Sequence, residues 1–456
     1  MSLFALFALM AASQAPSGGD GPPPRPNVLL ITMDQLAYSW VGALGTGFPK
    51  VDTPALDRLI ASGTTFRRHY ADNEVCHPSR SSILTGRPPI CHRALDNNVI
   101  LPASEETWAE LLQAQGWRTG AFGKIHSFSE GAWQGFDVAI DKEQIDAWLT
   151  TQGVNLWQHV VWFNRSRQIG KLVIQPRYQP EAIVADLAMD FMAQSGAQSW
   201  FAYVSFNNPH PPNVATAEGW AGVHPLDVPN VVPQSTFFVD KPAFTIARAI
   251  NLNFHKLHRD TARLQYAGYV AMIEETDRQI GRVLDWVATH ATDRPTLVVF
   301  TSDHGDMASQ LGLFDKLFGP YESAVRVPAI VAMPGAMPAG AAVDGFSQHS
   351  DLLPTVLELL AEPIPPAIKG RSLVGLAHGG PPVHDYVFSG RELGDVSRMV
   401  SDGRYTLITH PGQPSEFYDL QADPQQIVNR IQDPQLASEI SRLDQALTVW
   451  RASICQ

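Results

Sequence analysis

The chain has 456 residues, of which 45% are hydrophobic and 17% charged, a composition typical of a globular protein with a large buried core. Its formal net charge of -12 argues against nucleic acid as a ligand, because binding to phosphates needs clustered Lys and Arg. Three cysteines, Cys76, Cys91 and Cys455, are too few for a disulfide framework, and their spacing does not resemble a zinc site. Such an acidic protein can still bind an anionic substrate through a few local cations and a metal ion.

Residues 1–26 predict a signal peptide followed by a linker. Residues 1–15 hold about ten apolar residues and then small ones, and residues 16–26 are rich in Pro and Gly. The apolar run is too short to span a bilayer, and no Lys or Arg precedes it. We interpret it as an export signal, which predicts a periplasmic or secreted protein; a misassigned or truncated start is the alternative. No later segment is apolar over the length of a membrane span.

Strand and helix patterns alternate over residues 27–365. Short apolar runs, typical of strands buried on both faces of a parallel sheet, occupy residues 27–34, 117–123, 199–206, 296–303 and 328–335. Helical patterns occupy residues 53–63, 107–116, 181–196 and 262–290. In the first three, a Thr or acidic residue stands near the start and a Gly near the end, as helix capping requires. This alternation predicts an α/β catalytic domain, in which helices sandwich a large, mostly parallel sheet.

The pattern changes after about residue 365. Short alternating strands, separated by turn signals, occupy residues 385–391, 397–410 and 415–420, and a helical pattern covers residues 436–454. Residues 366–456 therefore predict a C-terminal subdomain, a small antiparallel sheet with one helix.

Residues able to bind a metal ion or transfer a proton follow four of the predicted strands. They are Asp34 and Gln35, Lys124 and His126, Asn207, Asn208 and His210, and Asp303 and His304. Because ligands of open α/β sheets lie beyond the carboxyl ends of the strands, we expect these side chains to share one edge. Two carboxylates, an amide oxygen and an imidazole suit a mainly hard divalent cation, Ca²⁺, Mg²⁺ or Mn²⁺. The three His or Cys ligands that zinc favours are not apparent.

Cys76 lies in the segment "VCHPSR". As a lone cysteine it can be a buried structural thiol, a metal ligand, a nucleophile or the precursor of a modified residue. Pro78 fits the first turn of a helix, which would place Cys76 at a helix N-terminus, where backbone N–H groups attract an anion. Arg80, one turn along, adds a fork of donors suited to a tetrahedral oxyanion.

The segment "CHPSRSSILTGR" resembles the sulfatase signature, C-x-P-S-R followed by T-G-R. Further segments resemble that family in its order along the chain: "NVLLITMDQ", "VDTPALDRLIASGTTF", "GKIH", "NPHPP", "TSDHGD", "YESAVRVP" and "EFYDLQADPQQ". The resemblance spans nearly the whole chain and implies an alkaline-phosphatase-like fold. It also implies that a separate formylglycine-generating or equivalent enzyme converts Cys76 to formylglycine, an aldehyde whose hydrate is the nucleophile. A thiolate nucleophile is disfavoured, because the groups predicted around Cys76 suit an oxyanion and a hard cation.

The resemblance implies a role for each site residue. One divalent ion, Ca²⁺ in the first place, would be bound by Asp34, Gln35, Asp303, His304 and the modified Cys76. The other roles are Arg80 holding the nucleophile and neutralising its charge, Lys124 and Lys316 gripping the sulfate oxygens, and His126 and His210 handling protons. One hydroxyl of the hydrate would attack sulfur, and His210, with Lys316, would protonate the alcohol that leaves. His126 would then deprotonate the second hydroxyl, so that the aldehyde reforms and sulfate leaves.

Two positions depart from the commonest family pattern. Gln35 stands where many members have Asp, and His304 where many have Asn. This pair resembles the choline-sulfatase and phosphonate-monoester-hydrolase branches, so a phosphonate monoester or phosphodiester hydrolase is the leading alternative to a sulfatase. Lys124 and His126 favour sulfate, because that phosphonate branch lacks this pair. A catalytically silent, metal-bearing binding protein is a second alternative.

Other residues near the signature carry weaker predictions. His77 occupies the variable position of the signature, so we interpret it as substrate-facing or incidental and not as catalytic. Cys91 and His92 fit a pocket-lining loop better than a second metal site. Asn97, in the same loop, is a candidate substrate contact by analogy with family members.

The alcohol half of the substrate is not encoded in a recognisable motif. We expect it to be selected by residues 127–180 and 212–263, which leaves a small osmolyte, an aryl ester and a sulfated sugar open. Trp148, Trp157 and Trp162 fit a packed insertion better than a platform for stacking carbohydrate.

Overall fold

The computed structural model describes residues 25–45, 50–128, 133–229, 231–308 and 310–456. The predicted signal peptide and most of its linker therefore lie outside the described residues. Within the described ranges, no helix combines the length and the apolar character needed to cross a membrane.

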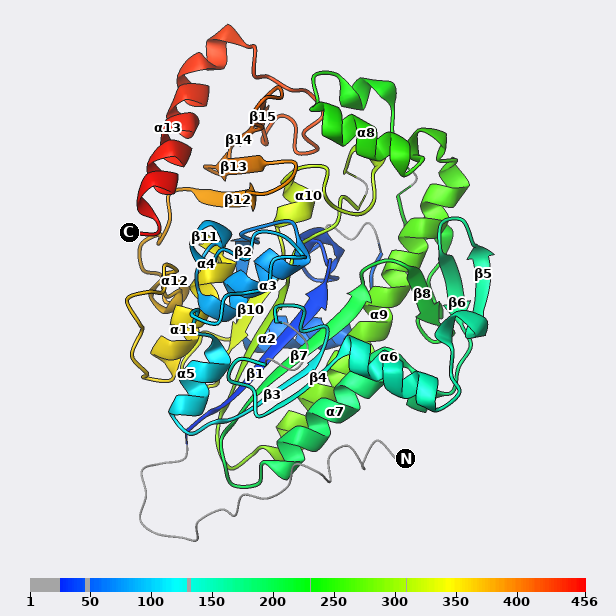
Figure 1. Cartoon of the computed structure of the whole chain (residues 1–456), viewed down its shortest axis with the longest axis vertical. Coiled ribbons are helices and arrows are strands. Elements are labelled where there is room, and N and C mark those ends of the chain that lie inside the picture. Colours follow the sequence, from blue (N-terminus) through cyan, green and yellow to red (C-terminus); the bar gives the residue numbers. More distant parts are fainter. Residues whose placement is uncertain (1–24, 46–49, 129–132, 230, 309) are drawn as a thin grey trace.

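An eight-stranded sheet forms the centre of the molecule, with strand order β11-β2-β10-β9-β1-β7-β3-β4 (Figure 1). Its strands are β1 (Asn27–Asp34), β2 (Thr64–Tyr70), β3 (Arg118–Gly123), β4 (Val138–Asp141), β7 (Trp200–Pro209), β9 (Thr296–Ser302), β10 (Ala329–Ala332) and β11 (Ala341–Gln348). The pairings are parallel except for those of β10, which is antiparallel to both β9 and β2. The predicted mostly parallel sheet is confirmed.

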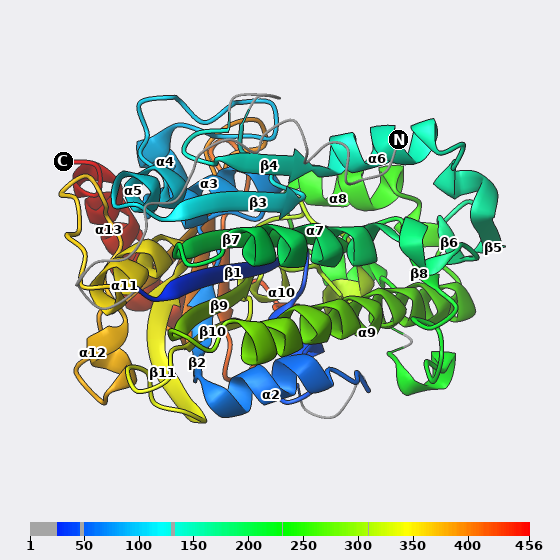
Figure 2. The same cartoon turned by 90° about the horizontal axis from the view of Figure 1, so that it is seen from below.

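Both faces of the sheet are buried, because successive side chains of a strand point to opposite sides. In β1, Leu29 and Ile31 belong to one apolar core, and Val28 and Leu30 belong to another. Figure 2 shows three helices along the first face. They are α2 (Pro54–Ser62), α7 (Pro180–Gln194) and α9 (Arg259–His290). The second core is closed by α3 (Cys76–Thr85), α5 (Trp108–Ala114) and α11 (Leu352–Leu359).

The four predicted helices form as α2, α5, α7 and α9, with ends that differ by a few residues. The capping signals account for a start such as that of α5. There the Thr107 side chain accepts a hydrogen bond from the Glu110 backbone, and the Glu110 side chain accepts one from the Thr107 backbone. Local sequence thus determines where this helix begins.

A second sheet, of four antiparallel strands, forms the C-terminal part of the chain. Its strands, in order, are β12 (Val387–Arg391), β13 (Ser397–Ser401), β14 (Tyr405–Thr409) and β15 (Glu416–Asp419). Leu443 and Leu447 of α13 (Ala437–Ser453) share a core with Val400 and Leu407 of this sheet. The predicted antiparallel sheet with one helix is confirmed. The domain boundary at residue 365 stays a prediction, since α12 (Val374–Ala377) contributes to the same core as α11.

Other elements have no clear signal in the sequence. They include the helices α4 (Pro89–His92), α6 (Lys142–Thr151), α8 (Ala243–Asn251) and α10 (Glu322–Val325), and a three-stranded sheet of β5 (Val160–Asn164), β6 (Ile169–Leu172) and β8 (Asn213–Thr216). The strand β2 was also missed, because Arg67 and Arg68 interrupt its apolar pattern and both are exposed. Most of these elements lie in the segments for which the sequence carries no motif.

Candidate active site

Four neighbouring parallel strands bring polar side chains to one edge of the central sheet. In the order β9-β1-β7-β3, Asp303 follows β9, Asp34 ends β1, His210 follows β7 and Lys124 follows β3. Their carboxyl ends point the same way because the pairings between them are parallel. The sheet therefore brings together segments that are up to about 270 residues apart in the chain.

Cys76 is the first residue of α3, and its side chain faces this edge. The preceding Val75 is extended, and Pro78 lies in the first turn, where a missing N–H leaves no bond unmade. The helix ends at Gly86, whose φ of 64° is left-handed and suits glycine. Cys76 is buried and forms no disulfide, so it is a free thiol at the N-terminus of a ten-residue helix.

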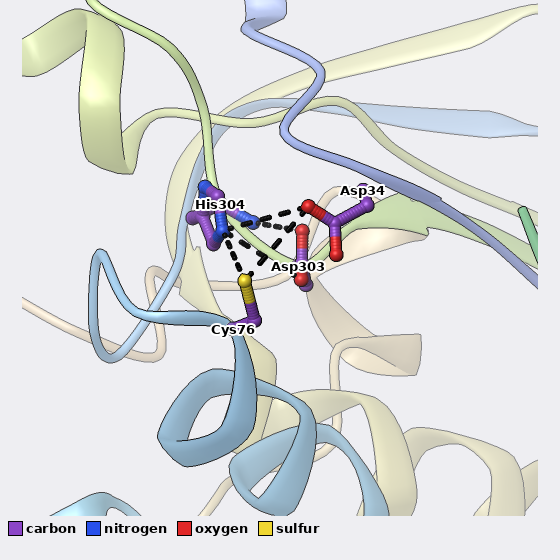
Figure 3. A group of neighbouring side chains, drawn as sticks. All are labelled: Asp34, Cys76, Asp303 and His304. Carbon is purple, nitrogen blue, oxygen red and sulfur yellow. Dashed lines mark hydrogen bonds and ion pairs between the residues drawn. The ribbon is translucent and has the colours of Figure 1, made fainter. Parts of the chain in front are cut away.

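Asp34, Cys76, Asp303 and His304 form a compact group of candidate metal ligands (Figure 3). One ligand atom from each lies within 4.8 Å of all the others. The Cys76 Sγ atom lies 3.2 Å from His304 Nε2 and 3.9 Å from Asp34 Oδ1. His304 Nδ1 lies 2.8 Å from the Gly305 carbonyl oxygen, and a proton donated there leaves the Nε2 lone pair facing the group. This donor set fits a divalent cation.

Gln35 is held between three polar side chains of the site. Its backbone N–H donates to Asp303 Oδ1 at 3.0 Å, and its side-chain Nε2 donates to Asp306 Oδ2 at 2.5 Å. Because the amide nitrogen is held by Asp306, the Oε1 atom accepts from Lys316 Nζ at 3.0 Å, and the predicted metal contact of Gln35 stays a prediction. The positioning role of Asp306 was missed, although it is the last residue of the quoted segment "TSDHGD".

Two lysines meet at the Cys76 sulfur. Lys316 Nζ lies 2.9 Å and Lys124 Nζ 3.8 Å from the Sγ atom. Lys124 Nζ also forms an ion pair of 2.6 Å with Asp34 Oδ2. Lys316 lies in the loop after β9, 12 residues beyond His304, but 240 residues from Cys76 in the chain, so the tertiary fold brings it to the sulfur. The two ammonium groups suit an anionic substrate at this point.

Arg80 joins the two carboxylates. Its side chain is fully buried, with Nη2 2.8 Å from Asp34 Oδ2 and Nε 2.9 Å from Asp303 Oδ2. Its Nη1 atom donates to the Lys124 carbonyl and to the Ser205 hydroxyl, both at 2.7 Å. These contacts position two of the candidate metal ligands. The predicted role of Arg80 toward the nucleophile stays a prediction.

The site favours negative charge at residue 76. Burial raises the pKa of Asp34, but the positive charges of Lys124, His210 and Lys316 outweigh it and hold the pKa well below its usual value. Burial and the Asp34 charge likewise raise the pKa of the Cys76 thiol, yet both lysines bring it well below its usual value. The same cations that suit an oxyanion thus favour the anionic form of an unmodified thiol at residue 76. That residue 76 acts in a modified form and not as a thiolate nucleophile stays a prediction.

The two predicted proton-transfer histidines flank this cluster. His210 Nδ1 lies 2.7 Å from the Pro211 carbonyl oxygen. The positive charge of His210 is one of those that lower the pKa of Asp34. His126 follows Lys124 by two residues, and its buried Nδ1 has no hydrogen-bond partner among the described residues. Both histidines thus keep a ring nitrogen available for a proton.

His77 and Asn97 contact each other. The Asn97 side chain accepts from the His77 backbone N–H at 3.1 Å, and His77 Nε2 lies 2.9 Å from the Ser127 carbonyl. His77 is buried, and its ring centroid lies 5.6 Å from that of His126. The predicted substrate contact of Asn97 stays a prediction, while its observed contact supports the backbone next to Cys76.

Cys91 and His92 belong to the short helix α4 and not to the predicted loop. Cys91 forms a disulfide with Cys455, 364 residues away. The His92 ring is buried, with Nδ1 accepting from the Ala94 N–H and Nε2 facing the Ser82 hydroxyl. These contacts give both residues structural roles. The disulfide has no signal in the sequence, because nothing local indicates which two of three cysteines meet.

Behind the ligands lies a buried contact that sequence reasoning missed. The Ser79 hydroxyl donates to the Asp303 carbonyl and lies 2.9 Å from His349 Nδ1. Ser79 is part of the signature segment, which is a signal that could have led to it. His349 had no such signal.

Comparisons with known proteins identify the family of this chain. The sequence pattern of the family described as "Sulfatase" matches residues 26–362. The chain belongs to the sulfatase family. A second pattern, described as "N-sulphoglucosamine sulphohydrolase, C-terminal", matches residues 309–453. The resemblance predicted from the motifs is confirmed, and this sulfatase-family protein is a hydrolase.

Its relatives include several sulfatases. The ulvan-active sulfatase of Formosa agariphila is 28% identical over 93% of this chain and 81% of that protein. The choline-sulfatase of Rhizobium meliloti is 26% identical over 94% of this chain and 86% of that protein. The solved phosphonate monoester hydrolase of Agrobacterium radiobacter shares the fold, with a TM-score of 0.81 and 24% identity over 94% of this chain and 96% of that one.

Proposed function

We propose that this sulfatase-family enzyme hydrolyses a sulfate ester to an alcohol and inorganic sulfate. The observation that carries the proposal is the convergence of Lys124 and Lys316 on Cys76, beside a cluster of hard-metal ligands. Fixed positive charge at that point lowers the barrier for attack on an anionic ester. The sulfatases among the relatives support the same reading.

The metal site is proposed to hold one divalent ion, Ca²⁺ in the first place, with Mg²⁺ and Mn²⁺ as alternatives. Asp34, Gln35, Asp303 and His304 would bind it, together with the modified Cys76. Carboxylate and amide oxygens dominate this set, and hard cations prefer such ligands. When bound, the ion would neutralise charge on the sulfate group.

The nucleophile is proposed to be formylglycine derived from Cys76. Its hydrate would supply two hydroxyl groups on one carbon, one for attack and one whose deprotonation releases sulfate. Lys124 and Lys316 would donate hydrogen bonds to the sulfate oxygens and hold the ester beside residue 76. His210 would give a proton from Nε2 to the alcohol oxygen as its bond to sulfur breaks, since Nδ1 is held by the Pro211 carbonyl. His126 would accept the proton of the second hydroxyl.

Hydrolysis of a phosphonate monoester or phosphodiester at the same site is the second candidate. The Gln35 and His304 pair favours it, because this pair resembles the phosphonate-monoester-hydrolase branch. Lys124 and His126 favour sulfate, since they resemble the sulfatase pair. The two reactions transfer similarly charged groups, so one site can accept both.

We further propose that the enzyme is exported and that a formylglycine-generating or equivalent enzyme is its partner. The apolar character of residues 1–15 supports export. The Cys91–Cys455 disulfide supports it as well, because disulfides persist mainly in oxidising compartments.

The test compares enzyme produced with and without a formylglycine-generating partner, using Cys76→Ala as the inactive control. Oxidation of the thiol to an aldehyde should lower the mass of the Cys76 peptide by about 18 Da. We expect turnover of 4-nitrophenyl sulfate and choline sulfate to rise with the oxidised fraction and with bound metal. Phenyl phosphonate monoesters and phosphodiesters are assayed in parallel.

Each other outcome contradicts part of the proposal. A higher kcat/KM for the phosphonates would favour the second candidate. A persistent thiol together with no turnover of any ester would favour a silent, metal-bearing binding protein. Substantial activity of folded Cys76→Ala would exclude nucleophilic catalysis by residue 76.

A further inference from the structure

A cavity of about 620 Å³ opens at the carboxyl end of β7. Residues of α6, the adjoining short helix η2 (Leu156–His159), β8 and α9 line it, so most of its wall comes from the segments that carry no motif. We propose that this cavity binds the alcohol half of the substrate, and that this alcohol is an oligosaccharide with no second anionic group. The inference rests on the proposed sulfate-ester hydrolysis and names its substrate class.

The end of β7 contributes residues to the cavity wall and leads directly to a residue of the candidate site. Asn207 and Asn208 line the cavity, and His210 follows two residues later. His210 is close enough to Asp34 for its charge to lower the pKa of that carboxyl group. The Asn208 backbone N–H donates to Glu181 at 3.2 Å, which ties this strand end to α7. An alcohol that receives its proton from His210 therefore extends toward the cavity.

Trp157 provides a flat apolar face in the cavity wall. It is 53% exposed and stacks on Trp162, with ring centroids 5.8 Å apart and an interplanar angle of 11°. Two stacked indoles hold that face in place, and the C–H faces of sugar rings pack well on such aromatic surfaces. Trp148 differs, because it is half-buried and packs against Tyr178 with centroids 6.0 Å apart. The expectation of a packed insertion thus fits Trp148 but not Trp157.

Four amide side chains line the same cavity as Trp157: Asn155, Gln158, Asn207 and Asn208. Asn155 Oδ1 accepts from the Trp157 backbone N–H at 3.1 Å, which leaves its N–H groups for a ligand. Amides both donate and accept, as the hydroxyl groups of a sugar do. A cavity that combines an aromatic face with several amides suits an uncharged polyhydroxy ligand better than an alkyl or simple aryl group.

The charges of the wall disfavour a second sulfate. Lys142 is the single Lys or Arg among the described lining residues, and its ammonium group pairs with Asp146. Glu181 and Glu275 also line the cavity, so a second sulfate would meet carboxylates without a free cation. The volume falls in the range that binds molecules of several rings. These features together point to a singly sulfated oligosaccharide.

The test measures kcat/KM for singly 6-O-sulfated mono-, di- and trisaccharides of the glucose and galactose series, with 4-nitrophenyl sulfate as a short substrate. For the wild-type enzyme we expect kcat/KM to rise by about tenfold or more from the mono- to the trisaccharide in at least one series. The rise should come from a lower KM. Trp157→Ala should lower kcat/KM for that trisaccharide by about three- to tenfold, a clearly larger factor than its loss on 4-nitrophenyl sulfate. Trp157→Phe should keep most of the gain. Val173→Ala, an equally exposed apolar residue outside the cavity lining, is the matched control.

Several results would overturn the inference while leaving the proposed function intact. One is hydrolysis of 4-nitrophenyl sulfate with no gain from chain length in either series. Another is a Trp157→Ala variant whose kcat/KM falls by the same factor on the short and the long substrates. A third is a trisulfated trisaccharide that is hydrolysed as well as the singly sulfated one. If enzyme with oxidised Cys76 hydrolyses no sulfate ester of any size, the proposed function itself is wrong.

Discussion

Cys76 and Asp303 belong to two layers of the same site. Cys76 Sγ faces the two lysines and His304, whereas Asp303 lies behind it and accepts hydrogen bonds from Gln35 and Arg80. Burial raises the pKa of Asp303, and the Arg80 charge opposes that rise. A divalent cation would favour the ionised form further. We therefore expect metal binding to be the property most sensitive to changes at Asp303.

We predict that Asp303→Ala loses bound metal and activity together. The variant removes one proposed metal ligand and leaves the buried Arg80 without one of its partners. Mutation of a residue that only holds a metal ligand in place lowers activity by up to about a hundredfold, so loss of the ligand itself should lower activity by more than that. Asp303→Asn keeps the side-chain shape and is the control for folding. Metal content by elemental analysis, circular dichroism and kcat/KM check the prediction. Full activity in a metal-free Asp303→Ala enzyme would rule out the metal role.

We predict that His92 makes the free energy of unfolding depend on pH. Burial, with smaller effects of His77 and Arg87, lowers the pKa of His92 from about 6.5 to about 3. The unfolded chain therefore binds a proton at this site before the folded protein does, and stability falls as pH drops below about 6.5 and continues to fall toward about 3. One such group contributes up to about 1.4 kcal/mol per pH unit in that window.

In the His92→Gln variant, the part of the pH dependence of the free energy of unfolding that is due to His92 should disappear, whatever the stability of the variant at pH 7. Urea unfolding of both proteins at about pH 7, 6 and 5 measures it. If the free energies of unfolding of the two proteins change in parallel with pH, His92 does not titrate as inferred.

At the scale of elements, β12 fixes the segment that leads into α3. The Asn73 side chain donates to the Gly390 carbonyl at 2.8 Å. Arg391 Nε lies 2.9 Å from Glu74 Oε1, and both side chains are buried. The C-terminal sheet therefore holds the chain just before Cys76, although the two segments are more than 300 residues apart. This contact gives the C-terminal sheet a part in positioning Cys76.

We predict that Arg391→Met lowers the free energy of unfolding by about 3–5 kcal/mol, because it leaves the Glu74 charge buried and unpaired. Adding Glu74→Gln should recover much of the loss, since the double variant buries no unpaired charge. Urea unfolding of both single variants and of the double variant gives the coupling free energy. Strictly additive effects would show that the ion pair does not connect these two elements.

The elements that could be predicted from sequence are those with a strong local pattern. The strands β1 and β9 are unbroken apolar runs, and α5 carries its own cap, so local rules locate them. The pattern of β2 is interrupted by exposed arginines, and its pairing with β10 and β11 is decided by distant segments. The three-stranded sheet was missed for a similar reason, since β8 joins β6 across more than 40 residues.

At the scale of the whole molecule, the Cys91–Cys455 disulfide attaches the end of α13 to α4 (Figure 1). The cross-link joins residues 364 positions apart, so it removes many conformations from the unfolded chain. It also closes the C-terminal part onto the helix that follows α3.

We predict that Cys455→Ser lowers the free energy of unfolding by about 2–4 kcal/mol. Wild type in reductant should melt at the temperature of the variant, whereas the variant should not respond to reductant. The Cys76→Ala enzyme, which keeps the disulfide, is the control for effects of reductant on the free thiol. Equal melting temperatures for wild type and Cys455→Ser without reductant would contradict a stabilising role.

The sequence by itself determined the fold class, the family and the identities of the candidate site residues. It could do so because strand runs, helix caps and the "CHPSR" segment are local patterns whose meaning does not depend on distant parts of the chain. Only the tertiary structure decided that Lys316 reaches Cys76, that Asp306 orients Gln35 and that Cys91 pairs with Cys455. The cavity beside β7 belongs to this second group as well. These features arise from contacts between distant segments, and such contacts are set by how the whole chain packs.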